Sequence, residues 1–93
     1  MGRATKDTIA ALAPLYDEVR SLGIAGLEVK SNGAVYQKRN GILHFHEDAT
    51  GVQADVKVNG VWERVEVNNA AGKRRVVALL RRQYASPPAA GSA

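Results

Sequence analysis

Two histidines one residue apart, His44 and His46, have the spacing in this chain that most directly suggests chemistry. They lie in the stretch Gly41-Ile-Leu-His-Phe-His-Glu-Asp48, which we predict to be the middle strand of a small sheet. Successive side chains of a strand point to opposite faces, so both imidazoles share one face. An H-x-H pair can chelate a divalent metal ion, with Asp55 or Glu66 as a third ligand. The alternative is two surface histidines that bind nothing in particular.

A second arrangement places Asp55 on a neighbouring strand, between His44 and Arg64. A carboxylate in that position can fix the tautomer of an imidazole, as general acid–base catalysis requires. No serine or cysteine falls near this row in the predicted sheet, and Thr50 is only a loop neighbour. A cross-strand charge pair that helps to set the strand register is the simpler interpretation. We therefore predict no catalytic residues.

Trp62, the single tryptophan of the chain, is expected on the same face beside Lys57. Large exposed aromatic side chains are enriched where proteins bind partners. The alternative is that the indole covers the stem of Lys57, or is buried by the C-terminal tail or by a second copy of the chain.

The elements that position these residues follow from turn signals between Leu27 and Val67. Asn-Gly favours a two-residue hairpin turn, because a type I′ turn needs positive φ at both central residues. The chain has this dipeptide at Asn32-Gly33, Asn40-Gly41 and Asn59-Gly60. We predict an antiparallel meander of five strands, over residues 27–31, 34–39, 42–46, 52–58 and 61–67.

The register follows from two-residue Asn-Gly turns and a six-residue loop after His46. It predicts one apolar row across the sheet, made of Val29, Tyr36, Phe45, Ala54 and Val65. The adjacent row on the other face is polar and consists of Glu28, Gln37, His44, Asp55 and Arg64. A one-residue slip would invert the faces of a strand, so this separation supports the register. Lys38 and Glu63 are exceptions, which we place at the rim of the apolar face.

Two amphipathic helices flank the meander. Residues 5–22 have apolar side chains at helical spacing, and Pro14 predicts either a bend or a restart within them. Residues 69–84 form the second predicted helix, with Asn68 or Asn69 as its cap. Both helices should cover the apolar sheet face, which gives an α+β, two-layer sandwich whose polar face is open.

The basic character of the chain belongs to its C-terminal segment. Residues 1–68 carry a net charge of −1, whereas residues 69–93 carry +5 and no acid. The basic side chains of this segment are Lys73, Arg74, Arg75, Arg81 and Arg82. They can contact nucleic-acid phosphates. The alternative is that they complement the dipole of the helix C-terminus.

The length and composition of the chain indicate one domain over residues 1–84, followed by a disordered tail over 85–93. Cysteine is absent, which excludes disulfides and thiol catalysis. No apolar run reaches the roughly 20 residues of a membrane helix. The first residues do not read as a signal peptide, so we expect a cytoplasmic protein.

The segment Arg39-Asn-Gly-Ile-Leu-His-Phe-His-Glu-Asp48, followed by Gly51-Val-Gln-Ala-Asp55 and a helix, resembles the small bacterial proteins of the luciferase-domain family. The resemblance covers about residues 27–84. It implies the same fold and draws attention to His44, His46 and Asp55, but it implies no mechanism.

Taken together, these patterns favour a small module, non-enzymatic or of unassigned activity, that binds a small ligand or a protein partner on its open sheet face. The predicted ligand-binding residues are His44, His46, Asp55, Trp62 and Arg64, with His44 and His46 as candidate ligands of a divalent metal ion. The second hypothesis is a nucleic-acid-binding protein that uses the basic C-terminal helix. A third is a homodimer that buries Trp62 between open faces.

Overall fold

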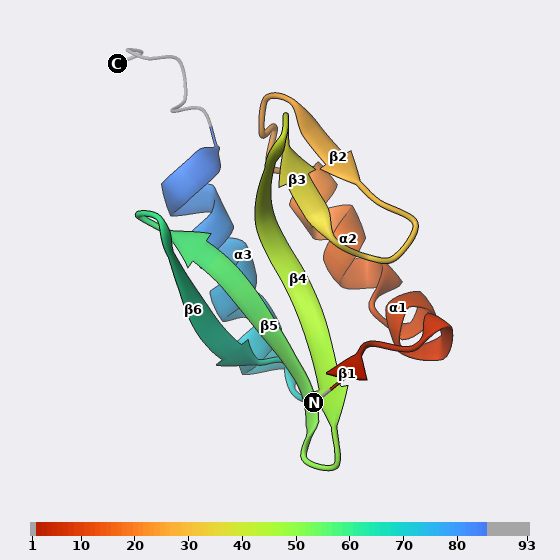
Figure 1. Cartoon of the computed structure of the whole chain (residues 1–93). Coiled ribbons are helices and arrows are strands. Elements are labelled where there is room, and N and C mark those ends of the chain that lie inside the picture. The colour runs from red at the N-terminus through yellow and green to blue at the C-terminus, as the bar shows by residue number, and fades with distance from the viewer. Residues whose placement is uncertain (1, 86–93) are drawn as a thin grey trace.

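A computed structural model describes residues 2–85 and shows an α+β chain (Figure 1). Its helices are α1 (Lys6–Ala11), α2 (Ala13–Arg20) and α3 (Ala70–Tyr84). Its strands are β1 (Gly2–Arg3), β2 (Leu27–Val29), β3 (Val35–Gln37), β4 (Asn40–Asp48), β5 (Gly51–Val58) and β6 (Val61–Glu66). Beyond Ala85, the predicted tail lies outside the described residues.

The N-terminal amphipathic segment forms two short helices that meet at Leu12. Thr5 caps α1, because its side-chain oxygen accepts a hydrogen bond from the backbone N–H of Thr8. Pro14 lies in the first turn of α2, where its missing N–H would have no helical partner. Of the two predicted alternatives, a bend and a restart, the restart is therefore confirmed.

The sheet contains the five predicted strands in the order β2-β3-β4-β5-β6, all antiparallel. β1 is a sixth strand that we did not predict, and it places Arg3 opposite His46. The same end of β4 pairs with β5 on its other edge, so β1 and β3 share one edge of β4. β1 therefore lies beside the strand that carries the histidines (Figure 1).

The register of β4, β5 and β6 confirms the prediction. The polar row contains His44, Asp55 and Arg64, and the apolar row contains Phe45, Ala54 and Val65. The connection after His46 is shorter than the predicted six-residue loop, since β4 continues until Asp48 faces Gly51. The register is unchanged because the pairing of His46 with Gln53 simply continues through Glu47 with Val52 to Asp48 with Gly51.

The predicted turn between β3 and β4 was wrong. The turn lies at Lys38-Arg39, with Gln37 facing Asn40, and Lys38 supplies the positive φ of 57°. Lys38 is therefore a turn residue and not a rim residue. Asn40-Gly41 belongs to β4, so the strongest local turn signal was overridden by strand pairing.

A β-bulge in β4 explains why Asn40-Gly41 pairs within the sheet and does not form a turn. Val35 faces Leu43 whereas Tyr36 faces Gly41, which leaves Ile42 without a partner on β3. Ile42 and Leu43 are both buried in the core, although neighbouring residues of a regular strand point to opposite faces. The predicted register would have exposed Ile42 on the polar face.

The predicted pairing of the first strands was therefore also wrong. Val29 faces Val35, and Tyr36 lies between Glu28 and Gly41, away from Phe45. The Tyr36 ring packs over Gly41, where an added Cβ atom would make an ordinary van der Waals contact with the ring at 3.6 Å. Gln37 faces Leu27 and donates to the carbonyl of Ala25, so it does not belong to the polar row.

The helices cover one face of the sheet, as predicted. Figure 1 shows α2 behind β3 and β4, and α3 behind β5 and β6. Buried side chains of the helices and the sheet form a single core cluster, which includes Leu15, Tyr16, Val19, Leu43, Phe45, Val56, Val65, Val76, Val77 and Leu80. Glu63 lies at the rim of this layer, where its carboxylate pairs with Arg75 of α3 at 2.6 Å. The opposite, polar face carries the candidate site.

Within residues 2–85, no helix has the length and apolar character needed to cross a membrane.

Candidate functional site

Three antiparallel strands bring the predicted ligand-binding residues together. Alternation along β4 points His44 and His46 away from the core, while Phe45 between them is buried against it. Asp55 lies directly opposite His44 on β5, and Arg64 lies opposite Asp55 on β6. The site is therefore positioned by backbone hydrogen bonding and not by a loop.

Asp55 is the centre of the cluster. His46 Nε2 lies 3.0 Å from Asp55 Oδ2, and His44 Nδ1 lies 3.8 Å from the same oxygen. Arg64 grips the carboxylate with two hydrogen bonds, from Nε to Oδ1 at 3.0 Å and from Nη2 to Oδ2 at 3.2 Å. This two-pronged contact fixes the plane of the carboxylate.

Burial and charge set the ionisation of the cluster. Asp55 is only 7% exposed, and this burial by itself raises its pKa. The hydrogen bonds and positive charge of Arg64 outweigh burial and, with the two histidines, hold the pKa of Asp55 below its ordinary value. Burial lowers the pKa of His44, and the attraction of Asp55 only partly opposes this effect. Near neutral pH the cluster therefore combines an ionised carboxylate with an uncharged His44 imidazole.

Trp62 forms one side of the cluster. Its ring lies 4.4 Å from that of His44, and His44 in turn meets the His46 ring edge-on at 4.8 Å. Lys57 places its ammonium nitrogen 5.0 Å from the centre of the Trp62 ring, as expected from the predicted neighbourhood. Trp62 remains 42% exposed, so the indole presents apolar surface beside the histidines.

The histidines and Asp55 offer two imidazole nitrogens and one carboxylate oxygen that could hold a metal ion. One ligand atom from each of the three residues lies within 4.8 Å of the other two. Tetrahedral Zn²⁺ with bonds of about 2.1 Å holds its ligand atoms roughly 3.4 Å apart. The distances of 3.0 and 3.8 Å from Asp55 Oδ2 to the imidazole nitrogens bracket that value. Glu66, the other predicted third ligand, is exposed at the end of β6 opposite Gln53.

Glu47 and Asp48, the two acids that follow the histidines, make hydrogen bonds that hold the neighbouring backbone in place. Glu47 accepts hydrogen bonds from the backbone N–H of Thr5 and the hydroxyl of Thr8, which lower its pKa and fix the start of α1. Asp48 accepts from the backbone and hydroxyl of Thr50, which lower its pKa and close the β4–β5 turn. Both carboxylates are therefore engaged outside the histidine cluster.

Gln53 and Arg3 are neighbours of the site that sequence reasoning missed. Gln53 lies opposite His46 and is only 6% exposed; its amide donates to Thr50, while Oε1 is buried without a protein partner among the described residues. Alternation along β5 in the predicted register already places Gln53 on the polar face beside His46, but we did not predict it as a binding residue. No signal in the first residues indicated that Arg3 would pair with β4.

The basic residues of α3 do not form a comparable cluster. Arg74, Arg81 and Arg82 are exposed on the helix layer, on the opposite side of the sheet from the histidines. Arg75 is held by Glu63. The structure therefore separates the two sets of predicted binding residues into two surfaces.

No protein-family model, no curated protein and no solved structure matches this chain. The resemblance to the luciferase-domain family accordingly stays a prediction.

Proposed function

We propose that the chain is a small binding module whose open sheet face holds a divalent transition-metal ion at His44, His46 and Asp55. The observation that carries this proposal is the convergence of two imidazole nitrogens and one carboxylate oxygen within 4.8 Å. Imidazole nitrogen suits Zn²⁺, Cu²⁺ and Ni²⁺, whereas Mg²⁺ and Ca²⁺ prefer oxygen ligands.

The groups around these three residues support the proposal. A metal-binding carboxylate is commonly oriented by hydrogen bonds from other side chains, and the contact from Arg64 Nε to Asp55 Oδ1 supplies one. Oδ2 is the oxygen that faces the histidines, and it also accepts a hydrogen bond from Arg64 Nη2 at 3.2 Å, so an ion would share this oxygen with Arg64. The positive charge of Arg64 opposes that of a cation, so we expect moderate affinity.

Three protein ligands leave one position of a tetrahedral ion for a further ligand. The exposed indole of Trp62 beside His44 offers apolar contact to such a ligand. The module would thus hold a small molecule or a partner side chain through the ion and recognise its apolar part with Trp62.

The test is a calorimetric titration of the metal-free protein with Zn²⁺, with Mg²⁺ as a comparison. We expect one Zn²⁺ per chain, no heat of binding from Mg²⁺, and loss of Zn²⁺ binding in a His44→Ala, His46→Ala double variant. Thermal unfolding without metal checks that the variant is folded. Equal Zn²⁺ binding by the folded double variant would contradict the proposal.

The hypothesis of nucleic-acid binding by α3 is supported by the exposure of Arg74, Arg81 and Arg82 on one helix. It requires retention on single-stranded DNA at low salt that weakens steeply as salt increases. Replacing the three arginines by glutamine should then abolish retention, whereas the double histidine variant should be retained like the wild type.

A further inference from the structure

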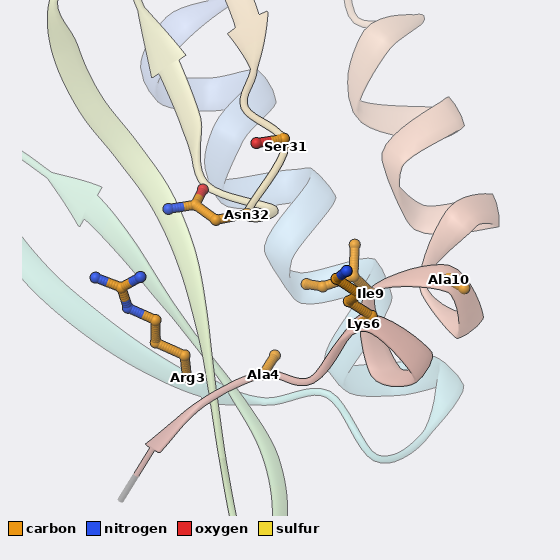
Figure 2. Close-up of a pocket in the computed structure, with 7 residues that line it drawn as sticks. All are labelled: Arg3, Ala4, Lys6, Ile9, Ala10, Ser31 and Asn32. Atoms are coloured by element: carbon orange, nitrogen blue, oxygen red, sulfur yellow. The ribbon is translucent and has the colours of Figure 1, made fainter.

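A pocket beside the N-terminal strand lies outside the histidine cluster. It has a volume of about 610 Å³ and is lined by Arg3, Ala4, Lys6, Ile9, Ala10, Ser31 and Asn32. Figure 2 shows its two walls: the chain from β1 into α1 on one side, and the loop between β2 and β3 on the other. This volume lies in the range of small-molecule sites, roughly 300–1,000 Å³.

The two walls are fastened to each other, so the pocket is formed before any ligand arrives. Gly33 of the β2–β3 loop is buried against α1 and α2, where an added Cβ atom would meet the side chains of Ile9 and Tyr16. The Tyr16 hydroxyl also donates to the Gly33 carbonyl at 2.6 Å. A pre-formed site binds more tightly, because less conformational freedom is lost on binding.

The polar side chains of the pocket offer hydrogen-bond donors at its two ends. Arg3 and Lys6 are cationic and have no acceptor atoms. Asn32 uses its side-chain oxygen to accept from the backbone N–H of Ala34 at 3.0 Å, which leaves its NH₂ group to donate. No acid lines the pocket among the described residues; Glu47, which fixes the start of α1, is turned toward Thr5 and Thr8. The charge of the site is thus complementary to an anion.

The rest of the lining on the α1 side is apolar and consists of Ala4, Ile9 and Ala10. In Figure 2, Ile9 and Lys6 project from α1 into the space below the β2–β3 loop, and Arg3 lies on the β4 side. A ligand that fills this space therefore meets cations at its edge and aliphatic side chains along its body.

The pocket also adjoins the histidine strand. A smaller hollow of about 140 Å³ shares Arg3 and Asn32 with it and is lined further by His44, Phe45 and His46. On this edge of β4, β3 pairs only as far as Leu43, and β1 pairs only from His46 onward. The hollow lies between these two pairings, where this edge of β4 has no neighbouring strand within the described residues. Arg3 therefore stands between the two spaces.

From this arrangement we propose that the pocket between α1 and the β2–β3 loop binds a small organic anion with an apolar body, such as a carboxylate or sulfonate on a ring or short chain. Arg3 and Lys6 attract the anionic group from opposite sides of the pocket, and Ile9 with Ala10 contacts the apolar part. This site is separate from the proposed metal site and does not depend on a bound ion.

The test uses the fluorescent probe anilinonaphthalene sulfonate and its uncharged analogue N-phenylnaphthylamine. We expect saturable binding of the sulfonate at one site, weakened about tenfold or more in an Arg3→Gln, Lys6→Gln variant that has lost both charged donors. Binding of the uncharged analogue should change by less than about twofold, because only apolar contacts hold it. The matched control, Lys38→Gln with Arg39→Gln, removes the same charge from the distant β3–β4 turn and should bind the sulfonate like the wild type.

A second variant controls for disruption of the short β1 strand by the substitution of Arg3. Ala10 is exposed on α1, so Ala10→Glu leaves the fold intact and adds a negative charge to the pocket wall. It should weaken sulfonate binding as well, whereas the double histidine variant should not. Equal weakening by the Lys38, Arg39 control, or unchanged binding in both pocket variants, would overturn the proposal while leaving the metal site untouched.

Discussion

Two arginine–carboxylate pairs lie on opposite sides of this sheet, and they differ in what surrounds the carboxylate. On the open face, Arg64 grips Asp55, whose side chain is 10% exposed and also faces two imidazoles. On the helix side, Arg75 pairs with Glu63, whose side chain is 38% exposed. The first carboxylate is enclosed by groups that converge on it, whereas the second meets a single cation at the rim.

This difference shows why charge alone does not identify a site. The most basic segment of the chain is α3, yet its exposed arginines do not converge on a shared acceptor. The sheet face is nearly balanced in charge, but its strands hold donors and acceptors in fixed positions around Asp55. Convergence of unlike groups, enforced by strand register, is what suggests binding here.

The largest effect should come from removing the enclosed carboxylate. Asp55→Asn should weaken Zn²⁺ binding by at least about 100-fold, because even groups that only orient metal ligands contribute about 10–100-fold. Glu66→Gln, an exposed acid at the end of the same sheet, should change Zn²⁺ affinity by less than about threefold. Calorimetric titration of both variants measures the contrast, and equal losses would mean that general electrostatic attraction holds the ion.

The pairs made by Arg64 and Arg75 should also differ in how much they stabilise the fold, with the enclosed pair of Arg64 contributing more. Arg64→Gln should lower the melting temperature clearly, because the buried carboxylate of Asp55 loses its main partner. Arg75→Gln should lower the free energy of unfolding by at most about 1 kcal/mol, because its pair with Glu63 is exposed to solvent. Melting curves in metal-free buffer separate these effects. Similar shifts would indicate that enclosure does not distinguish the pairs.

Acidification should affect the open face first. The folded-state pKa values of His44 and Asp55 both lie below their ordinary values of 6.5 and 3.8. A group whose pKa is lowered by folding contributes fully to stability above its ordinary, unfolded-state pKa. This contribution is lost as the pH falls through the folded-state pKa. Trp62 is the only tryptophan and its ring contacts that of His44, so its fluorescence should fall as that imidazole gains a proton below pH 6.5. His44→Gln should remove this transition, and a midpoint above 6.5 would contradict the assignment.

The smallest effect is expected on the helix side. Replacing Arg74, Arg81 and Arg82 by glutamine should change Zn²⁺ affinity by about twofold or less, because exposed charges behind the sheet are screened by salt. The same variant tests the nucleic-acid hypothesis through its retention on single-stranded DNA. A large change in Zn²⁺ affinity would show that the two surfaces are coupled.

The predictable part of the candidate site follows from alternation along strands. The row of His44, Asp55 and Arg64 could be found because a slip between β4, β5 and β6 would have turned apolar residues outward. The turn at Asn59-Gly60 matched its signal, with φ of 53° and 80°. The N-terminal half of the sheet could not be predicted this way, because a bulge breaks the alternation at Ile42.

The remaining features depend on contacts between distant segments. Pairing of Gly2 and Arg3 with the end of β4 involves only two residues, too few for any pattern in the sequence. The pocket beside α1 depends on Gly33 packing against Tyr16, which local propensity does not encode. Two-layer α+β architecture, in contrast, follows from the apolar stripes of the helices and the apolar face of the sheet.

The most direct test of the proposed metal site is X-ray absorption at the zinc edge of the one-to-one Zn²⁺ complex. We predict two imidazole nitrogens together with oxygen donors at about 2.0–2.2 Å, and one imidazole fewer in His46→Ala. A spectrum that shows only oxygen donors, or one that is identical in the variant, would contradict coordination by His44, His46 and Asp55.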